Sequence, residues 1–296
     1  MKHQFIDKQF REGSLILIDQ ANGIIDGYQA QGYSLTLRQL YYQFVARDLI
    51  PNNMRSYKRL GSVLSDARLA GYVDWDAIED RTRELEELNT YENASEIVRN
   101  CVYWFRSDRW ENQEHRLEVW IEKEALVGVI QRICEAWNVP YFACRGYNSQ
   151  SEQYKAGRRF AQYYRNGQTP VVIHLGDHDP SGINMTEDND TRLRMFAQHR
   201  VEVKRIALNM DQVEEYNPPP NYAKESDSRY HAYCDEFNTT DCWELDALEP
   251  SVINDLIREQ IDEYREDELW QDRLDYESEV KAELQDIADN LDSRGR

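Results

Sequence analysis

The sequence predicts a mixed α/β protein in three parts: a basic helical part, a parallel sheet flanked by helices, and an acidic helical tail. Three observations predict this order. Residues 31–73 carry six basic and two acidic residues, a net charge of +4, and residues 251–296 carry 15 acidic and six basic residues, a net of −9. Between them, residues 115–210 alternate apolar runs with amphipathic stretches. The 296 residues, 41% of them hydrophobic, suffice for one large or two ordinary domains with apolar cores.

The first predicted part, residues 1–110, is mostly helical. Residues 37–45 form an amphipathic helix, because their apolar side chains recur at helical spacing. Ser34 or Thr36 caps this helix at its start, and the proline-containing segment 50–53 breaks it. The apolar stripe of the helix consists of Leu37, Leu40, Tyr41, Phe44 and Val45.

A second helix follows and has a basic face. Its apolar side comprises Tyr57, Leu60, Leu64 and Ala67. Its other side carries Arg55, Lys58 and Arg59, and a short strand is predicted at 72–75. Two helices joined by a tight turn, the second of them basic and followed by a strand, are typical of a helix-turn-helix with a wing. Such a fold would place the three basic residues against DNA backbone phosphates. An ordinary helical hairpin with a solvated basic face is the alternative.

The second predicted part, residues 115–250, holds the sheet. Strands are predicted at 117–121, 140–144, 170–175 and 201–208, and the helices between them at 123–137, 151–165 and 181–199. Regular alternation of strand and helix implies a parallel sheet with helices on both faces. In such sheets, ligands and catalytic groups gather at the carboxyl ends of the strands.

The third predicted part is an acidic helical extension, residues 251–296, which follows a loop-rich stretch. It could be a solvated face, a helix that docks a partner, or a screen against non-specific DNA binding. The whole chain has a formal net charge of −20, which argues against nucleic acid as a partner unless positive charge is concentrated locally. The basic segment near the N-terminus provides such a concentration.

The cysteines and the hydropathy pattern predict a cytoplasmic protein without a membrane segment. The five cysteines are scattered and form no CxxC pair, so neither a disulfide framework nor a cysteine zinc site is expected. No run approaches the roughly eighteen consecutive apolar residues that a membrane-spanning helix needs. The first residues lead into no apolar signal segment.

Two acidic sites fall at the predicted carboxyl edge of the sheet. Glu122 ends the first predicted strand, and Asp177 and Asp179 directly follow the third. Two carboxylates two positions apart in a loop, joined by a third from a neighbouring strand, form an oxygen-rich set that suits Mg²⁺. The alternative is that the segment 179–182, Asp-Pro-Ser-Gly, is only a turn and helix cap.

These segments resemble the Toprim fold, in the version found in the A subunit of DNA topoisomerase VI and in the related meiotic double-strand-break transesterase. Ile-Glu-Lys-Glu-Ala at 121–125 is similar to the family's glutamate strand, and Gly-Asp-His-Asp-Pro-Ser-Gly at 176–182 is similar to its DxDPxG loop. Upstream, Arg-Gln-Leu-Tyr-Tyr at 38–42 resembles the RxxYY motif of the family's CAP-like winged-helix domain. The resemblance covers residues 30–210 and places both domains in the same order.

The resemblance implies a type IIB topoisomerase A-subunit-like enzyme that cleaves DNA strands by transesterification. Tyr42, the second tyrosine of the motif, would be the nucleophile and form a phosphotyrosyl link, with Arg38 assisting. Glu122, Asp177 and Asp179 would hold Mg²⁺. The resemblance also implies a homodimer that acts on double-stranded DNA, in which the tyrosine of one protomer works with the metal site of the other. Strand passage would need a separate ATPase partner, because this chain contains no such motif.

The helical pattern agrees with this role for Tyr42. Tyr41 lies on the apolar stripe, whereas Tyr42 lies about 100° away, on the polar face and one turn from Arg38. An arginine at that place can stabilise charge on a phosphate or favour the phenolate. The alternative is a tyrosine at the surface or at a domain interface.

Two departures from the family pattern keep other functions open. The glycine segment Arg-Gly-Tyr at 145–147 lacks the family's usual lysine, and the residues after Tyr42 do not match the family. Relatives in the wider Toprim group lack a working tyrosine and cut DNA by metal-dependent hydrolysis. A Toprim nuclease that acts by hydrolysis is therefore one alternative. A non-catalytic DNA-binding or partner-recruiting protein is the other.

Overall fold

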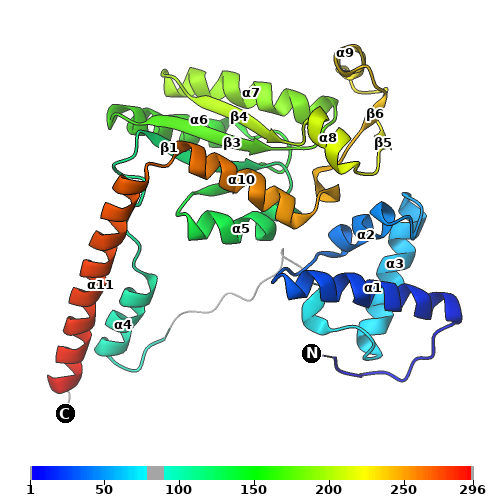
Figure 1. Ribbon diagram of the computed structural model, residues 1–296, viewed down its shortest axis with the longest axis horizontal. Coiled ribbons are helices and arrows are strands. Elements are labelled where there is room, and N and C mark those ends of the chain that lie inside the picture. Colours follow the sequence, from blue (N-terminus) through cyan, green and yellow to red (C-terminus); the bar gives the residue numbers. More distant parts are fainter. Residues whose placement is uncertain (1, 79–89, 295–296) are drawn as a thin grey trace.

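A four-stranded parallel sheet forms the centre of the computed structural model, which describes residues 2–78 and 90–294 (Figure 1). The strand order is β2-β1-β3-β4. The mixed α/β class and the parallel sheet predicted from the sequence are confirmed. The strands are β1 (His115–Ile121), β2 (Tyr141–Ala143), β3 (Thr169–Leu175) and β4 (Glu202–Ala207).

The register of the two central strands fixes the edge at which the acidic residues lie. Ile121 at the end of β1 pairs with Leu175 at the end of β3. The backbone N–H of Glu122 continues the ladder by donating to the carbonyl oxygen of Leu175 at 2.8 Å. Glu122 and Gly176, the first residues beyond the two strands, therefore leave the sheet at the same level.

Alternate strand residues face two different layers of helices, which accounts for the apolar run Val171-Val172-Ile173 in β3. On one face, Val119 and Ile173 share a core with α5 and α10, to which α10 contributes Ile253 and Ile257. On the other face, Val172 shares a core with α6 and α7. Part of the segment predicted as the acidic extension thus packs on the sheet. The elements are η2 (Glu124–Leu126), α5 (Val127–Ala136), α6 (Gln150–Arg165), α7 (Pro180–Ala197) and α10 (Pro250–Tyr264).

The N-terminal helices pack around a core of their own. Both helices predicted there are confirmed, and each begins at a side-chain cap. Thr36 accepts a hydrogen bond from the backbone of Gln39, whose side chain accepts one from the backbone of Thr36, which makes a capping box. Asn53 accepts from the backbone N–H of Ser56 at 2.9 Å. The helices are α1 (Glu12–Ala30), α2 (Leu37–Ala46) and α3 (Met54–Leu69).

The strand predicted at 72–75 is wrong. Gly71 turns the chain with a φ of 78°. Asp74 then accepts a hydrogen bond of 2.8 Å from the backbone N–H of Asp76 and starts a single 3₁₀ turn, η1 (Trp75–Ala77). A side chain that satisfies its neighbouring backbone in this way favours a turn over a strand. Residues 72–75, predicted as the strand of a wing, therefore form a turn after α3.

The stretch predicted to be loop-rich contains short elements that return the chain to the carboxyl edge of the sheet. β5 pairs with β6 in antiparallel fashion, and His178 forms an isolated bridge with Trp243. A hydrogen bond of 2.7 Å joins the His178 ring to the hydroxyl of Tyr233. These contacts place η3 beside the loop after β3, and η3 also packs against α2. The elements are α8 (Met210–Tyr216), β5 (Asn221–Tyr222), α9 (Tyr230–Phe237), β6 (Asp241–Cys242) and η3 (Leu245–Ala247).

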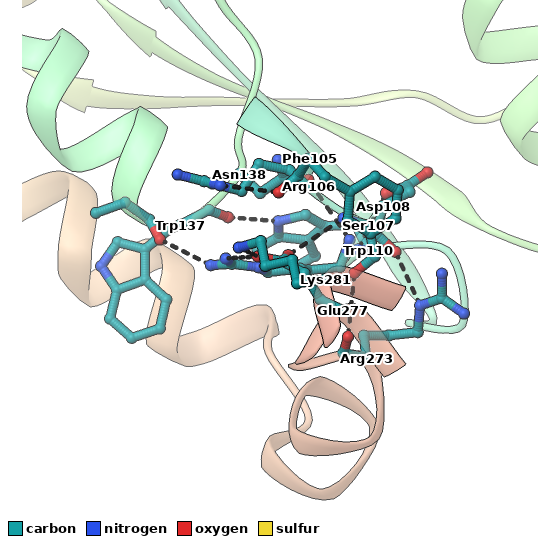
Figure 2. Close-up of polar contacts among 12 residues, drawn as sticks. Phe105, Arg106, Ser107, Asp108, Trp110, Trp137, Asn138, Arg273, Glu277 and Lys281 are labelled. Carbon is teal, nitrogen blue, oxygen red and sulfur yellow. Dashed lines mark hydrogen bonds and ion pairs between the residues drawn. The ribbon is translucent and has the colours of Figure 1, made fainter. Parts of the chain in front are cut away.

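The acidic C-terminal helix α11 (Asp267–Arg294) leaves the sheet and runs beside α4 (Ala94–Trp104) (Figure 1). The buried Glu277 of α11 is hydrogen-bonded to the segment that follows α4 (Figure 2). Its carboxylate accepts from the backbone N–H of Ser107 and from Nε of Arg109, each at 3.1 Å. It also accepts from Nζ of Lys281 at 2.6 Å. Its charge is therefore paired. No helix among the described residues, α11 included, is both long and apolar enough to cross a membrane.

Candidate active site

Two of the predicted acids meet at the carboxyl edge of the sheet. Oε2 of Glu122 accepts a hydrogen bond of 2.9 Å from the backbone N–H of Asp177, in the loop after β3. That loop turns tightly into α7. A Cβ at Gly182 would lie only 2.1 Å from the carbonyl oxygen of Asp177, so only glycine fits there. The register of the strands and this close turn hold Glu122 and Asp177 beside each other.

Asp179 lies in the same loop and caps the helix that follows. Its Oδ1 accepts a hydrogen bond of 2.6 Å from the backbone N–H of Gly182, with Pro180 in the first turn of α7. The predicted alternative of a helix cap is therefore confirmed for one carboxylate oxygen. Asp179 also lies near Glu122: burial raises the pKa of the Glu122 carboxyl, and the charge of Asp179 raises it further.

Lys123 lies between the acids of this loop and a second pair of acids. Its Nζ is 2.9 Å from Oδ1 of Asp177 and 3.8 Å from Oδ1 of Asp246, and it also pairs with Glu244. Glu244 precedes η3, and Asp246 lies within it. Burial alone would lower the pKa of Lys123, but the three carboxylates outweigh burial and raise it.

Burial also dominates the electrostatics of Asp177. It raises the pKa of Asp177 to about 8; Lys123 lowers this pKa only in part, and Glu122 raises it again. Beneath the loop, Arg205 of β4 donates to the carbonyl oxygens of Gly176 at 3.0 Å and Asp177 at 2.6 Å. Burial lowers the pKa of Arg205 to about 10. A strongly shifted acid with a specific charge partner is typical of functional sites.

The acidic edge has the donor chemistry of a Mg²⁺ site but not a converged ligand set. Within residues 2–78 and 90–294, no three His, Cys, Asp or Glu side chains are gathered so that they could hold a metal ion. Glu122 and Asp177 each use one carboxylate oxygen in a hydrogen bond from a backbone N–H. Their second oxygens make no hydrogen bond to a described residue. Because Mg²⁺ prefers carboxylate oxygens, these residues and Asp179 have the donor chemistry of such a site, with Nζ of Lys123 2.9 Å from Oδ1 of Asp177.

Tyr42 lies near this edge, on the side of α2 that the sequence predicts to be polar, and that side is buried rather than open to solvent. Its side chain is 6% exposed, nearly as buried as that of Tyr41 at 5%. The reason is that α2 packs against η3, so the polar side of the helix is covered. The guanidinium of Arg38, one turn earlier, lies 5.7 Å from the centre of the Tyr42 ring. Tyr42 is therefore an interface residue in this structure.

The surroundings of Tyr42 favour the protonated phenol. Burial and then the Glu244 carboxylate raise the pKa of Tyr42 to about 12, although Arg38 and Lys123 lower it. Arg38 by itself lowers the pKa of Tyr42, as expected, but burial and Glu244 raise this pKa by more. Both cations nevertheless lie within electrostatic reach of the phenol.

A pocket of about 350 Å³, here called the tyrosine pocket, lies beside Tyr42 and is also lined by Arg38 and Glu244. Nη2 of Arg38 lies 2.8 Å from Oε2 of Glu244. At the border of the pocket, Nδ2 of Asn52 donates to Oδ1 of Asn221 at 2.7 Å. A phenol, a guanidinium and a carboxylate therefore share one pocket, which α2, the start of α3, Asn221 and Glu244 line.

The three residues predicted to contact DNA are exposed on the first two turns of α3: Arg55, Lys58 and Arg59. Met54, the first residue of α3, lines the tyrosine pocket. Tyr57 of the same helix lines this pocket too, whereas Arg59 lines a separate pocket beside α1.

Glu244 and Asp246 belong to the site and were not predicted from the sequence. The segment 243–248, Trp-Glu-Leu-Asp-Ala-Leu, alternates apolar and acidic residues, and the Asp246 side chain is fully buried. An acid within an apolar run is a weak signal of a buried, paired charge, because an unpaired one is costly to bury. This pattern of acids within an apolar run is the sequence signal that could have indicated Glu244 and Asp246.

A comparison with protein-family models and with curated protein sequences finds no match to this chain. The resemblance to the topoisomerase VI A subunit therefore depends on the quoted motifs and their order.

Proposed function

We propose that this protein cleaves DNA strands by Mg²⁺-dependent tyrosine transesterification, as the topoisomerase VI A subunit does. The observation that supports this most is a continuous series of contacts from the tyrosine motif to the acidic edge. Arg38 lies over the Tyr42 ring and pairs with Glu244. Glu244 also pairs with Lys123, which in turn pairs with Asp177. The tyrosine motif and the acids are thus joined within one chain, and the resemblance implies that in a homodimer the tyrosine of one protomer works with the acids of its partner.

In the proposed reaction, the phenol oxygen of Tyr42 attacks a phosphorus of the DNA backbone. A Tyr–O–P bond forms as the bond from phosphorus to the 3′ oxygen of the neighbouring sugar breaks. The phenol loses its proton, and the leaving 3′ oxygen gains one. The protein then remains on the 5′ end, as the resemblance implies. Because the pKa of Tyr42 is raised, its proton must be removed as the attack proceeds.

The other site residues would orient the phosphate and neutralise its charge. Arg38, one turn from Tyr42, can bind phosphate oxygens through two N–H groups. Glu122, Asp177 and Asp179 would hold Mg²⁺, which when bound supplies charge neutralisation at the phosphate. The donor set favours such a hard cation.

Double-stranded DNA is the substrate class that the basic face of α3 fits. Arg55, Lys58 and Arg59 are exposed and would contact backbone phosphates, which gives position rather than sequence preference. A homodimer, as the resemblance implies, would place two such faces on one duplex and cut both strands.

The test is incubation of purified protein with supercoiled plasmid and Mg²⁺, stopped with detergent and resolved with and without protease treatment. The proposal expects nicked or linear DNA to enter the gel only after proteolysis, because the protein is attached to the DNA ends. Tyr42→Phe should abolish the attachment and retain DNA binding, while the neighbouring control Tyr41→Phe should retain both. An unchanged adduct in Tyr42→Phe would contradict the proposal.

A Toprim-type nuclease that acts by hydrolysis is the second candidate, favoured by the burial and raised pKa of Tyr42. It expects cut DNA that enters the gel equally without protease, persists in Tyr42→Phe and disappears in Asp177→Ala. A non-catalytic DNA-binding or partner-recruiting protein is favoured by the lack of a converged ligand set among the described residues. It expects salt-dependent binding and no cleavage with any divalent metal.

A further inference from the structure

Glu244 lies between two cations that come from different parts of the fold. Its Oε2 accepts a hydrogen bond of 2.8 Å from Nη2 of Arg38, on α2, and another from Nζ of Lys123, which follows β1. Glu244 itself precedes η3. One carboxylate oxygen thus joins the tyrosine motif to the acidic edge of the sheet.

The two cations are each held by another acid as well. Nε of Arg38 lies 2.7 Å from Oδ2 of Asp246, and Nζ of Lys123 lies 2.9 Å from Oδ1 of Asp177. The Asp246 side chain is fully buried, whereas that of Glu244 is 26% exposed and lines the tyrosine pocket. Glu244 can therefore withdraw toward solvent and leave the cations in place.

A site made of one guanidinium and one ammonium binds carboxylates and phosphodiesters by the same chemistry. The planar fork of arginine matches two phosphate oxygens, and lysine adds a point charge. The Arg38 side chain is 46% exposed, so an anion that arrives from solvent reaches it directly.

We propose that the Glu244 carboxylate stands in for a phosphodiester of the DNA backbone. Arg38 and Lys123 form the phosphate site beside Tyr42, and Glu244 withdraws from it when DNA binds. In the protein without DNA, Glu244 blocks this site against other anions. The identification of DNA as the ligand rests on the proposed function. The anion site itself does not depend on DNA cleavage.

The test measures binding of a short fluorescent DNA duplex by anisotropy, without Mg²⁺ and over a range of salt. Glu244→Gln keeps the shape of the side chain and removes the charge that competes with a phosphate. We expect this variant to bind about fivefold more tightly than the parent, at the lower end of the range for coupled ligands. Glu259→Gln, the matched control, removes the same charge from an exposed position on α10 and should change the affinity much less.

A second variant separates occupancy of the site from net charge, and it remains informative if Glu244→Gln folds poorly. Glu244→Asp keeps the charge and shortens the side chain by one methylene, so the carboxylate no longer spans Arg38 and Lys123. It should also bind more tightly than the parent. Adding Lys123→Gln to Glu244→Gln should remove the gain. If folded Glu244→Gln or Glu244→Asp binds no more tightly than Glu259→Gln, the inference is overturned.

Cleavage is a separate measurement that distinguishes this inference from the proposed function. If Glu244→Gln gains affinity but neither it nor the parent forms a covalent adduct, the phosphate site stands and the transesterase proposal fails. If a Tyr42-dependent adduct forms but Glu244→Gln binds no better than Glu259→Gln, the proposed function stands and the phosphate site fails.

Discussion

Nε of Arg38 lies 2.7 Å from Oδ2 of Asp246, and this ion pair joins the N-terminal helices to the sheet. Arg38 belongs to α2 and Asp246 to η3, which lies beside the acidic edge. The Asp246 side chain has no exposed surface, whereas that of Arg38 is 46% exposed. The position of the tyrosine motif therefore depends on a buried acid in the last third of the chain.

Replacing Arg38 by methionine should destabilise the protein by about 2 kcal/mol, because it leaves Asp246 buried with Lys123 at 3.8 Å as its nearest remaining cation. Urea unfolding followed by tryptophan fluorescence measures this. The exposed pair Arg258–Asp255 on α10, 3.8 Å apart, is the control, and Arg258→Met should destabilise by less than about 0.5 kcal/mol. Equal effects of the two substitutions would contradict the role given to the buried pair.

Binding of Mg²⁺ should strengthen as the pH rises toward 8. Because burial raises the pKa of Asp177 to about 8, this carboxyl is protonated below that pH and must release a proton to bind a cation. The affinity should rise by up to about tenfold for each pH unit below the pKa and level off above it. Calorimetric titration with MgCl₂ at several pH values measures this, with Asp177→Asn as the variant that should not bind. A pH-independent affinity would speak against Asp177 as a ligand.

Neutralising the basic face of α3 should reduce the salt dependence of DNA binding. Changing Arg55, Lys58 and Arg59 to glutamine should lower the slope of log affinity against log salt by about 3, because each phosphate contact releases close to one counterion. Anisotropy titrations at several KCl concentrations give this slope. An unchanged slope would show that this face does not touch DNA. A matched control neutralises three exposed basic residues of α6, namely Lys155, Arg158 and Arg165.

Low pH should weaken the contacts of the Glu277 carboxylate between α11 and the segment after α4 (Figure 2). Burial alone would raise the pKa of Glu277, but hydrogen bonds from Arg109 and Lys281 outweigh it and lower the pKa to about 2. A carboxylate with a depressed pKa gives stability that is present above its unfolded value, about 4.3, and is lost as the pH falls toward 2.

Glu277→Gln should therefore lower the free energy of unfolding at neutral pH by about 2–3 kcal/mol and flatten its decline below about pH 5. Denaturant unfolding at each pH measures both effects. A variant whose stability declines with acid as steeply as that of the parent would contradict the assignment to Glu277.

The sheet could be predicted from sequence because short apolar segments alternate with stretches of helical periodicity. The predicted strand 170–175 differs from β3 by one residue at its start. The turn at 72–75 could not be predicted from such a pattern. This turn depends on the cap made by Asp74 and on the packing of Trp75. The Trp75 ring lies against Phe5, with 5.6 Å between the ring centres, and against the guanidinium of Arg68. Those partners lie outside any local pattern.

The candidate site was predictable only where regular elements position it. Glu122 and Asp177 meet because parallel strands bring their carboxyl ends to one edge. The helical period correctly places Tyr42 off the apolar stripe of α2, but it does not reveal that η3 packs against that side. Glu244 follows the short β5–β6 pair, in a segment without a regular period, so its place between Arg38 and Lys123 depends on tertiary contacts alone.

The identity of the residue joined to DNA decides whether Tyr42 is the nucleophile. A plasmid cleavage reaction with Mg²⁺ is stopped with detergent and digested with nuclease and trypsin. Tandem mass spectrometry of the peptide 39–47, which contains Tyr41 and Tyr42, then locates any residual nucleotide. The account predicts a nucleotide linked through its 5′ phosphate to Tyr42 and none in Tyr42→Phe. A nucleotide on another residue, or cleaved DNA with no nucleotide-bearing peptide, would contradict it.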